Sequence, residues 1–155
     1  LDSKLIPSSQ GVNHEAHQCF LKLKGDFHRY IAEISVGDIY NRSIEKAMQS
    51  YDSALDVVTP LYSPAHPARL SLELNRTVMM YEIMNDDERA INYSKSLLTE
   101  GLKDLDTLGE DDAAEARILL KLIKDNLTLW TTDPKLFKAD TTQPDLKNRK
   151  DSKNF

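Results

Sequence analysis

Three side chains in residues 21–34 have the chemistry to bind an anion. Lys22 and Arg29 are seven positions apart, so on a helix they lie on nearly one line, and Tyr30 is one step further round. Arg offers a planar fork of donors to a phosphate, Lys a point charge and Tyr one hydroxyl donor. The same residues could also form a solvated helix edge, so the pattern alone leaves both interpretations open.

Two asparagines on other segments, Asn75 and Asn126, fall on faces that also carry apolar residues. A carboxamide has two donors and an acceptor, which is enough to hold the backbone of an extended peptide. Such amides can also simply bond neighbouring helices, so a binding groove and a structural role both remain open. The residues that share these faces are Val78 and Glu82 for the first and Leu119, Leu122 and Trp130 for the second.

Catalytic and metal-binding patterns are sparse. His14 and His17 are three positions apart, which departs from the HExxH spacing of zinc proteases. The sequence contains no glycine-rich phosphate loop and suggests no local nucleophile–base pair. We therefore predict no enzymatic activity, no cofactor and no metal, with a helical-bundle metalloenzyme as the weakest alternative because bundle sites can be assembled from scattered residues.

Charge and composition exclude several classes of protein. The 155 residues carry a net charge of −5, but residues 134–155 hold six Lys and Arg against three Asp, while the rest holds 14 against 22 Asp and Glu. An acidic body argues against general nucleic-acid binding. No apolar run reaches membrane-spanning length and no signal peptide opens the chain, so no membrane association is expected. The single Cys19, interpreted as a packed thiol, favours a reducing, cytoplasmic location.

Apolar residues recur at helical spacing in five segments joined by short links, which predicts an all-α, antiparallel helical array. A helical domain is expected over residues 1–133 and a basic, flexible tail over 134–155. Pro7-Ser8-Ser9 is expected to break the chain before the first helix, and Gly25 to permit close packing within it. The expected helices are residues 13–35, 38–60, 67–84, 87–108 and 111–131.

Several stretches together resemble the 14-3-3 proteins, in family order and with family-like spacing, over about residues 1–133. The resemblance implies an all-helical phosphoserine- and phosphothreonine-binding adaptor without enzymatic activity, whose helices form a concave groove and which dimerises. Its clients would be phosphorylated proteins. The matching stretches are LKLKGDFHRYIAE (21–33), HPARLSLELNRTV (66–78), YEIMN (81–85), LDTL (105–108) and KDNLTLWTTD (124–133).

The resemblance also implies a role for each candidate residue. Arg29 and Tyr30 look like the phosphate-binding pair of the family, with Lys22 on the same basic wall. The remaining matches are Asn75 and Asn126 for the ligand backbone, Leu74, Val78 and Leu122 for the apolar wall, and Glu82 and Trp130 for contacting the peptide and ordering the groove.

The chain departs from the family pattern in ways that suggest a divergent member with altered ligand preference. It resembles only the carboxyl-terminal five of the family's nine helices. In the family the amino-terminal helices, which this sequence does not include, carry two further phosphate-binding cations and most of the dimer interface. Homo- or heterodimers are therefore expected only where those helices exist. Single-residue departures are Ser71 for Gly, Glu73 for Ala, Arg76 for Phe, Lys124 for Arg and His28 for an aromatic residue.

The sequence thus favours a phosphopeptide-binding adaptor, with a phosphate-independent helical-repeat scaffold of the TPR type as the alternative. The tail adds a hypothesis of self-regulation. Thr142 has Pro144 two positions after it, and Ser152 has Arg149 three positions before it, and both patterns echo family ligand motifs. A phosphorylated tail could then occupy its own or a partner's groove, which a flexible linker of about 22 residues can reach.

Overall fold

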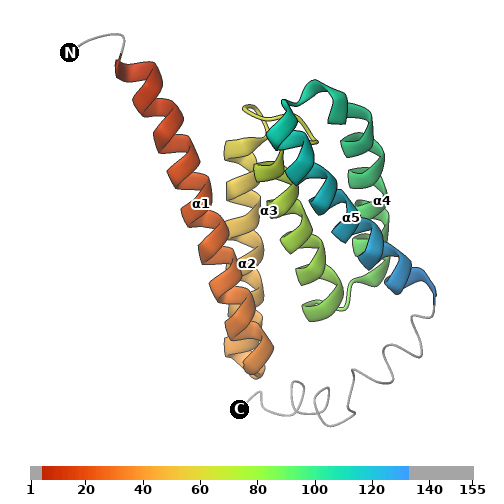
Figure 1. The fold of residues 1–155 in the computed structure, drawn as a ribbon. Helices are drawn as coiled ribbons and strands as arrows, with labels where there is room; N and C mark the ends of the chain where they lie inside the picture. The colour runs from red at the N-terminus through yellow and green to blue at the C-terminus, as the bar shows by residue number, and fades with distance from the viewer. Residues whose placement is uncertain (1–4, 133–155) are drawn as a thin grey trace.

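The computed structural model describes the backbone of residues 5–132 and the side chains of residues 13–132. Within this range the chain is all-α, as predicted, with short links and no strand (Figure 1). Helix α1 packs mainly on α2, and α3 contacts α2, α4 and α5. The elements are α1 (Leu5–Ile34), α2 (Gly37–Val58), α3 (Pro67–Val78), the π-helix η1 (Met79–Ile83), α4 (Asp87–Asp104), the 3-10 helix η2 (Leu105–Thr107) and α5 (Glu110–Thr132).

Helix α1 begins earlier than the sequence suggested. It starts at Leu5 and runs through Pro7, so the predicted break there is wrong. The reason is that a proline in the first turn of a helix costs little, since the amide hydrogen that it lacks has no partner there. The packed-thiol interpretation of Cys19 is also wrong: Cys19 is exposed, and its neighbour Gln18 is the buried residue.

The third predicted helix is not one continuous α-helix. After Val78 the chain widens into the π-helix η1, where the amide of Met84 donates to the carbonyl of Met79 at 3.0 Å. The fourth predicted helix likewise ends its α-helical part at Asp104 and continues as η2. Such π turns are rare and often lie at functional sites, and this one carries Glu82.

Gly25 lets α1 and α2 approach closely, as the sequence predicted. A Cβ atom at this position would lie 2.6 Å from Cε1 of Tyr51, which is closer than real Cβ contacts. The ring of Tyr51 therefore lies directly against the α1 backbone, and its hydroxyl reaches the next residue, Asp26, at 2.6 Å.

The side of α1 that faces away from α2 is apolar and exposed. Five large side chains recur there at spacings of three and four residues, which places them in one line along the helix. Their exposed fractions range from 55% to 87%, whereas Gly25 and Ala32 on the other side are buried. We refer to this line as the α1 stripe, which consists of Phe20, Leu23, Phe27, Tyr30 and Ile34.

Two of the divergent residues form a polar layer between α2, α3 and α4. Arg76 donates from Nε to Asp52 at 2.8 Å and lies over the ring of Tyr93, 5.0 Å from its centroid. Glu73 is only 3% exposed, and one of its carboxyl oxygens has no hydrogen-bond partner among the described residues. Burial raises the pKa of Glu73, while a hydrogen bond with Tyr93 and the charge of Arg76 act in the opposite direction.

Replacing the carboxyl group of Glu73 by an uncharged amide of the same shape is expected to stabilise the protein. Because the folded-state pKa of Glu73 lies above the unfolded one, the native state loses stability as the pH rises through these values. Glu73→Gln should therefore raise the unfolding free energy near neutral pH by about 1 kcal/mol, and the gain should vanish below about pH 4. Thermal melts followed by circular dichroism at several pH values would measure this.

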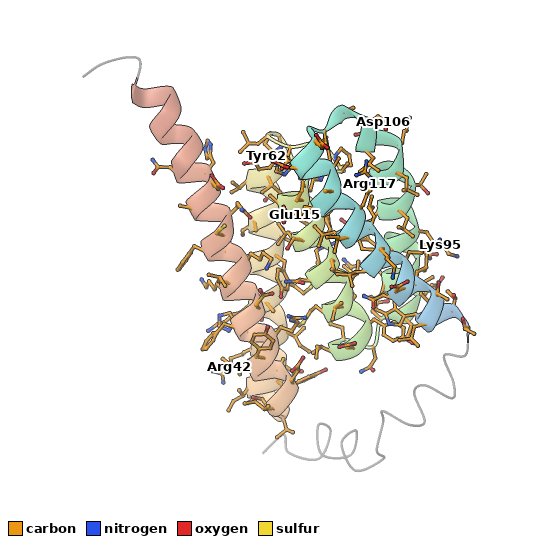
Figure 2. All side chains as sticks on the ribbon, in the orientation of Figure 1. Arg42, Tyr62, Lys95, Asp106, Glu115 and Arg117 are labelled. Atoms are coloured by element: carbon orange, nitrogen blue, oxygen red, sulfur yellow. The ribbon has the colours of Figure 1, made fainter. Side chains whose placement is uncertain are left out.

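The matched control is Glu115→Gln, which makes the same charge change on the exposed face of α5 (Figure 2). It should leave the melting temperature nearly unchanged at every pH. Equal shifts in the two variants would show that the burial of Glu73 is not the cause.

Candidate functional site

One buried carboxylate, Asp26, collects donors from three helices. On α1, Nζ of Lys22 lies 3.3 Å from Oδ2 and Nη2 of Arg29 lies 3.7 Å from Oδ1. The hydroxyl of Tyr51 on α2 donates to Oδ1 at 2.6 Å, and Nδ2 of Asn75 on α3 donates to the same oxygen at 3.0 Å. The structure thus brings Lys22, Arg29 and Asn75 together around a residue that the sequence analysis had not singled out.

Arg29 keeps donor capacity beyond this cluster. Its side chain is 12% exposed, and its Nε is buried without a hydrogen-bond partner among the described residues. Its guanidinium lies 5.1 Å from the ring centroid of Tyr30, a residue that is 55% exposed. An anion that approached here would find two cations within about two helical turns of each other, and an exposed tyrosine beside the second of them.

Two other groups, Tyr51 beside Asp26 and Glu82 near Arg29, have a raised pKa. Burial raises the pKa of Tyr51 well above its ordinary value, so Tyr51 is a neutral donor at physiological pH. Partial burial raises the pKa of Glu82, Glu33 raises it further, and Arg29 opposes both. Glu82 on η1 is therefore within electrostatic range of Arg29 on α1.

The predicted apolar wall lies on α3 and α5, which pack against each other. Leu74 and Val78 on α3 are partly buried, and Leu122 on α5 is 46% exposed. Asn126 on α5 is partly buried, and its side chain makes no hydrogen bond to another described residue, so its carboxamide can accept and donate. No hydrogen bond connects Asn126 with the Asp26 cluster within residues 13–132, so only Asn75 joins the cluster directly.

Trp130 is placed differently from the other candidate residues. It is 1% exposed and stacks on Tyr81 of η1, with ring centroids 4.3 Å apart and an interplanar angle of 10°. This placement fits the expected role of ordering the wall between η1 and α5. It offers no surface for the expected contact with a peptide.

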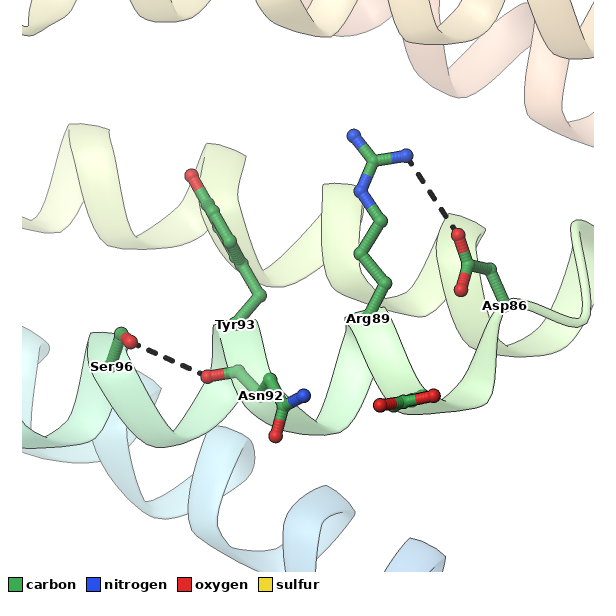
Figure 3. Close-up of a pocket in the computed structure, with 6 residues that line it drawn as sticks. Asp86, Arg89, Asn92, Tyr93 and Ser96 are labelled. Atoms are coloured by element: carbon green, nitrogen blue, oxygen red, sulfur yellow. Dashed lines mark hydrogen bonds and ion pairs between the residues drawn. The ribbon is translucent and has the colours of Figure 1, made fainter.

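Two hollows on the surface of the described residues lie elsewhere. One, of about 480 Å³, lies along the start of α4, and there Arg89 is already paired with Asp86 at 3.8 Å (Figure 3). A second, of about 500 Å³, lies along α2 beside Met84. Neither contains a predicted site residue, and neither gathers unpaired cations.

The other expectations concern metals, membranes and the tail. Residues 13–132 bring no three His, Cys, Asp or Glu side chains together in a way that could hold a metal ion. None of the helices in the described range has the length and apolar character of a membrane span. The predicted tail, with Thr142 and Ser152, lies outside the described residues.

Known proteins match the chain along most of its length. The family model for the 14-3-3 protein matches residues 1–131. The 14-3-3-like protein C of Nicotiana tabacum and the 14-3-3 protein 3 of Solanum lycopersicum are each 41% identical over 147 residues, covering 95% of this chain and 56% of theirs. A 14-3-3-like protein of Helianthus annuus is 43% identical over 133 residues, covering 86% of this chain and 51% of its own.

The chain therefore spans about half the length of these curated relatives. The family model covers most of this chain, and the match includes all five α-helices and every predicted site residue outside the tail. The resemblance seen in the sequence is confirmed: this chain belongs to the 14-3-3 family.

Proposed function

We propose that this protein is a non-enzymatic adaptor that binds phosphoserine- and phosphothreonine-containing segments of client proteins. The observation that carries the proposal is that Lys22, Arg29 and Asn75 all lie around the carboxylate of Asp26, beside the exposed side chain of Tyr30. Two cations and a phenol hydroxyl can bind a phosphoryl group, and an amide beside them can hold the backbone of the ligand.

In this proposal the phosphoryl group is bound first, by the side chains of α1 that surround Asp26. Arg29 supplies paired donors from its guanidinium, Lys22 supplies a point charge and Tyr30 adds a hydroxyl. Each charge-assisted hydrogen bond contributes about 1.5–3 kcal/mol. Because Arg29 and Lys22 are held by neighbouring groups before the ligand arrives, little side-chain freedom is lost on binding.

The peptide then extends along α3 and α5. Asn75 and Asn126 would hold its backbone, and Leu74, Val78 and Leu122 would contact its side chains. Trp130 is buried and would support this wall from the protein interior, through its stack on Tyr81. A phosphorylated Thr142 or Ser152 in the tail would be a ligand of the same chemistry, and dimerisation would use the helices that the longer relatives possess.

Calorimetric titration of a phosphoserine peptide and its unphosphorylated twin tests the proposal. Two or more charge-assisted bonds should favour the phosphorylated peptide by about 100-fold. Equal binding of the twins would contradict the proposal and favour a scaffold for unmodified peptides. Raising the salt concentration should weaken only the phosphorylated peptide, because only its binding depends on charge.

A further inference from the structure

The candidate phosphate site already contains an anion of its own. The carboxylate of Asp26 is 8% exposed and lies within 3.7 Å of donors on Lys22, Arg29 and Asn75. Lys22 and Arg29 are the same cations that an incoming phosphoryl group would use. A ligand therefore has to compete with Asp26 for them, and this competition has consequences for which ligands can bind.

The carboxylate is held firmly in this position. Tyr51 donates to Oδ1 at 2.6 Å, and it can do so only because Gly25 leaves room for its ring beside α1. The raised pKa of Tyr51 keeps its proton in place as a donor. Asp26 is therefore unable to turn towards solvent without breaking a buried hydrogen bond, which is costly.

An incoming carboxylate and an incoming phosphoryl group differ in how they meet this competitor. A glutamate on a peptide carries one charge and the same chemistry as Asp26, but it has to lose translational freedom and Asp26 does not. A peptide carboxylate that displaced Asp26 from the two cations would therefore gain no stronger interaction and would still lose its translational freedom. A phosphoryl group carries about −1.5 to −2 charges and three acceptor oxygens, so it can engage both cations while Asp26 keeps Tyr51 and Asn75.

We propose that Asp26 determines the specificity of this site, as an internal carboxylate that excludes peptide carboxylates and admits only a phosphoryl dianion. This inference rests on the proposed function, since it concerns the ligand class of the same site. In this inference Asp26 discriminates between anions, while the positive charges of Lys22 and Arg29 bind them.

The test compares three peptides that differ only at the central residue, which is phosphoserine, glutamate or serine. They are titrated against the wild type, Asp26→Asn and the control Asp56→Asn. The control makes the same charge change at an exposed position of α2 that is outside the site. In Asp26→Asn, the amide oxygen can still accept from Tyr51 while the competing charge is gone.

We expect the ratio of affinities for the phosphoserine and glutamate peptides to fall by about tenfold in Asp26→Asn, mainly through tighter binding of the glutamate peptide. The control should keep the wild-type ratio. A loss of stability alone would weaken both peptides equally, so the ratio separates selectivity from folding. Where circular dichroism shows that Asp26→Asn is unfolded, Asp26→Ser, whose hydroxyl can also accept from Tyr51, answers the same question.

The two proposals fail in different ways. A wild type that binds the phosphoserine and serine peptides equally would overturn the proposed function itself. A wild type that separates those two peptides, with an Asp26→Asn ratio equal to that of the wild type, would overturn the role of Asp26 and leave the proposed function standing.

Discussion

Arg29→Ala is expected to lower the affinity for a phosphoserine peptide by about 100-fold or more. Arg29 is the residue that can give a phosphoryl group two parallel charge-assisted bonds, and their loss costs about 3 kcal/mol, which is about 100-fold in affinity. Lys22 remains at the site in this variant, but it supplies a point charge and cannot replace the paired donors of a guanidinium. Calorimetry with the phosphorylated peptide and its unmodified twin measures the effect, and the twin should bind the variant as it binds the wild type.

Two further substitutions separate geometry from charge. Arg29→Lys keeps the charge but loses the planar fork, so its affinity should lie between those of the wild type and the alanine variant. Arg89→Ala removes an exposed arginine that is paired with Asp86 at the start of α4, and it should leave the affinity unchanged. If Arg29→Ala bound the phosphopeptide with the affinity of the wild type, the phosphoryl group would have to bind at another position.

Trp130→Ala is expected to reduce the unfolding free energy by about 3–5 kcal/mol. The side chain is among the largest fully buried ones, and its removal would leave a cavity beside Tyr81 and expose the contact between η1 and α5. For a domain of this size the melting temperature should fall by about 10 °C or more. Circular dichroism during heating would show the shift.

The neighbouring residue offers a matched control. Leu129 is on the same helix but is 47% exposed, so Leu129→Ala should cost less than about 1 kcal/mol. Trp130→Phe keeps an aromatic ring against Tyr81 and should give an intermediate value. If Trp130→Ala melted like the wild type, the stack would not be what holds η1 against α5.

The helices could be predicted from the sequence because the periodicity of apolar residues is a local signal. Lys22 and Arg29 could be placed on one line of a helix for the same reason. The π-helix at Met79–Ile83 could not be predicted, since its wider turn depends on packing rather than on a local pattern. The exposure of Cys19 was missed because apolar neighbours in the sequence do not show which face of α1 is covered, and the covered face holds the preceding residue, Gln18.

Asp26 shows most clearly where sequence reasoning ends. Its position four residues after Lys22 and three before Arg29 is visible in the sequence, and ion pairs at such spacings are common on helices, but the sequence analysis did not use it. Its two strongest partners are 25 and 49 residues away, on other helices. Helical spacing shows which residues share a face, but it does not show which face another helix covers, so the cluster emerges only from the packing.

The α1 stripe determines how the melting of this protein has to be followed. Dyes that fluoresce on apolar surface bind such side chains whether or not the chain is folded. In a dye-based melt the native protein would therefore start bright, and the rise on unfolding would be shallow or absent. The stability changes expected for Glu73→Gln and Trp130→Ala should accordingly be read from the loss of helical circular dichroism, a signal that reports the backbone and does not depend on dye binding to the α1 stripe.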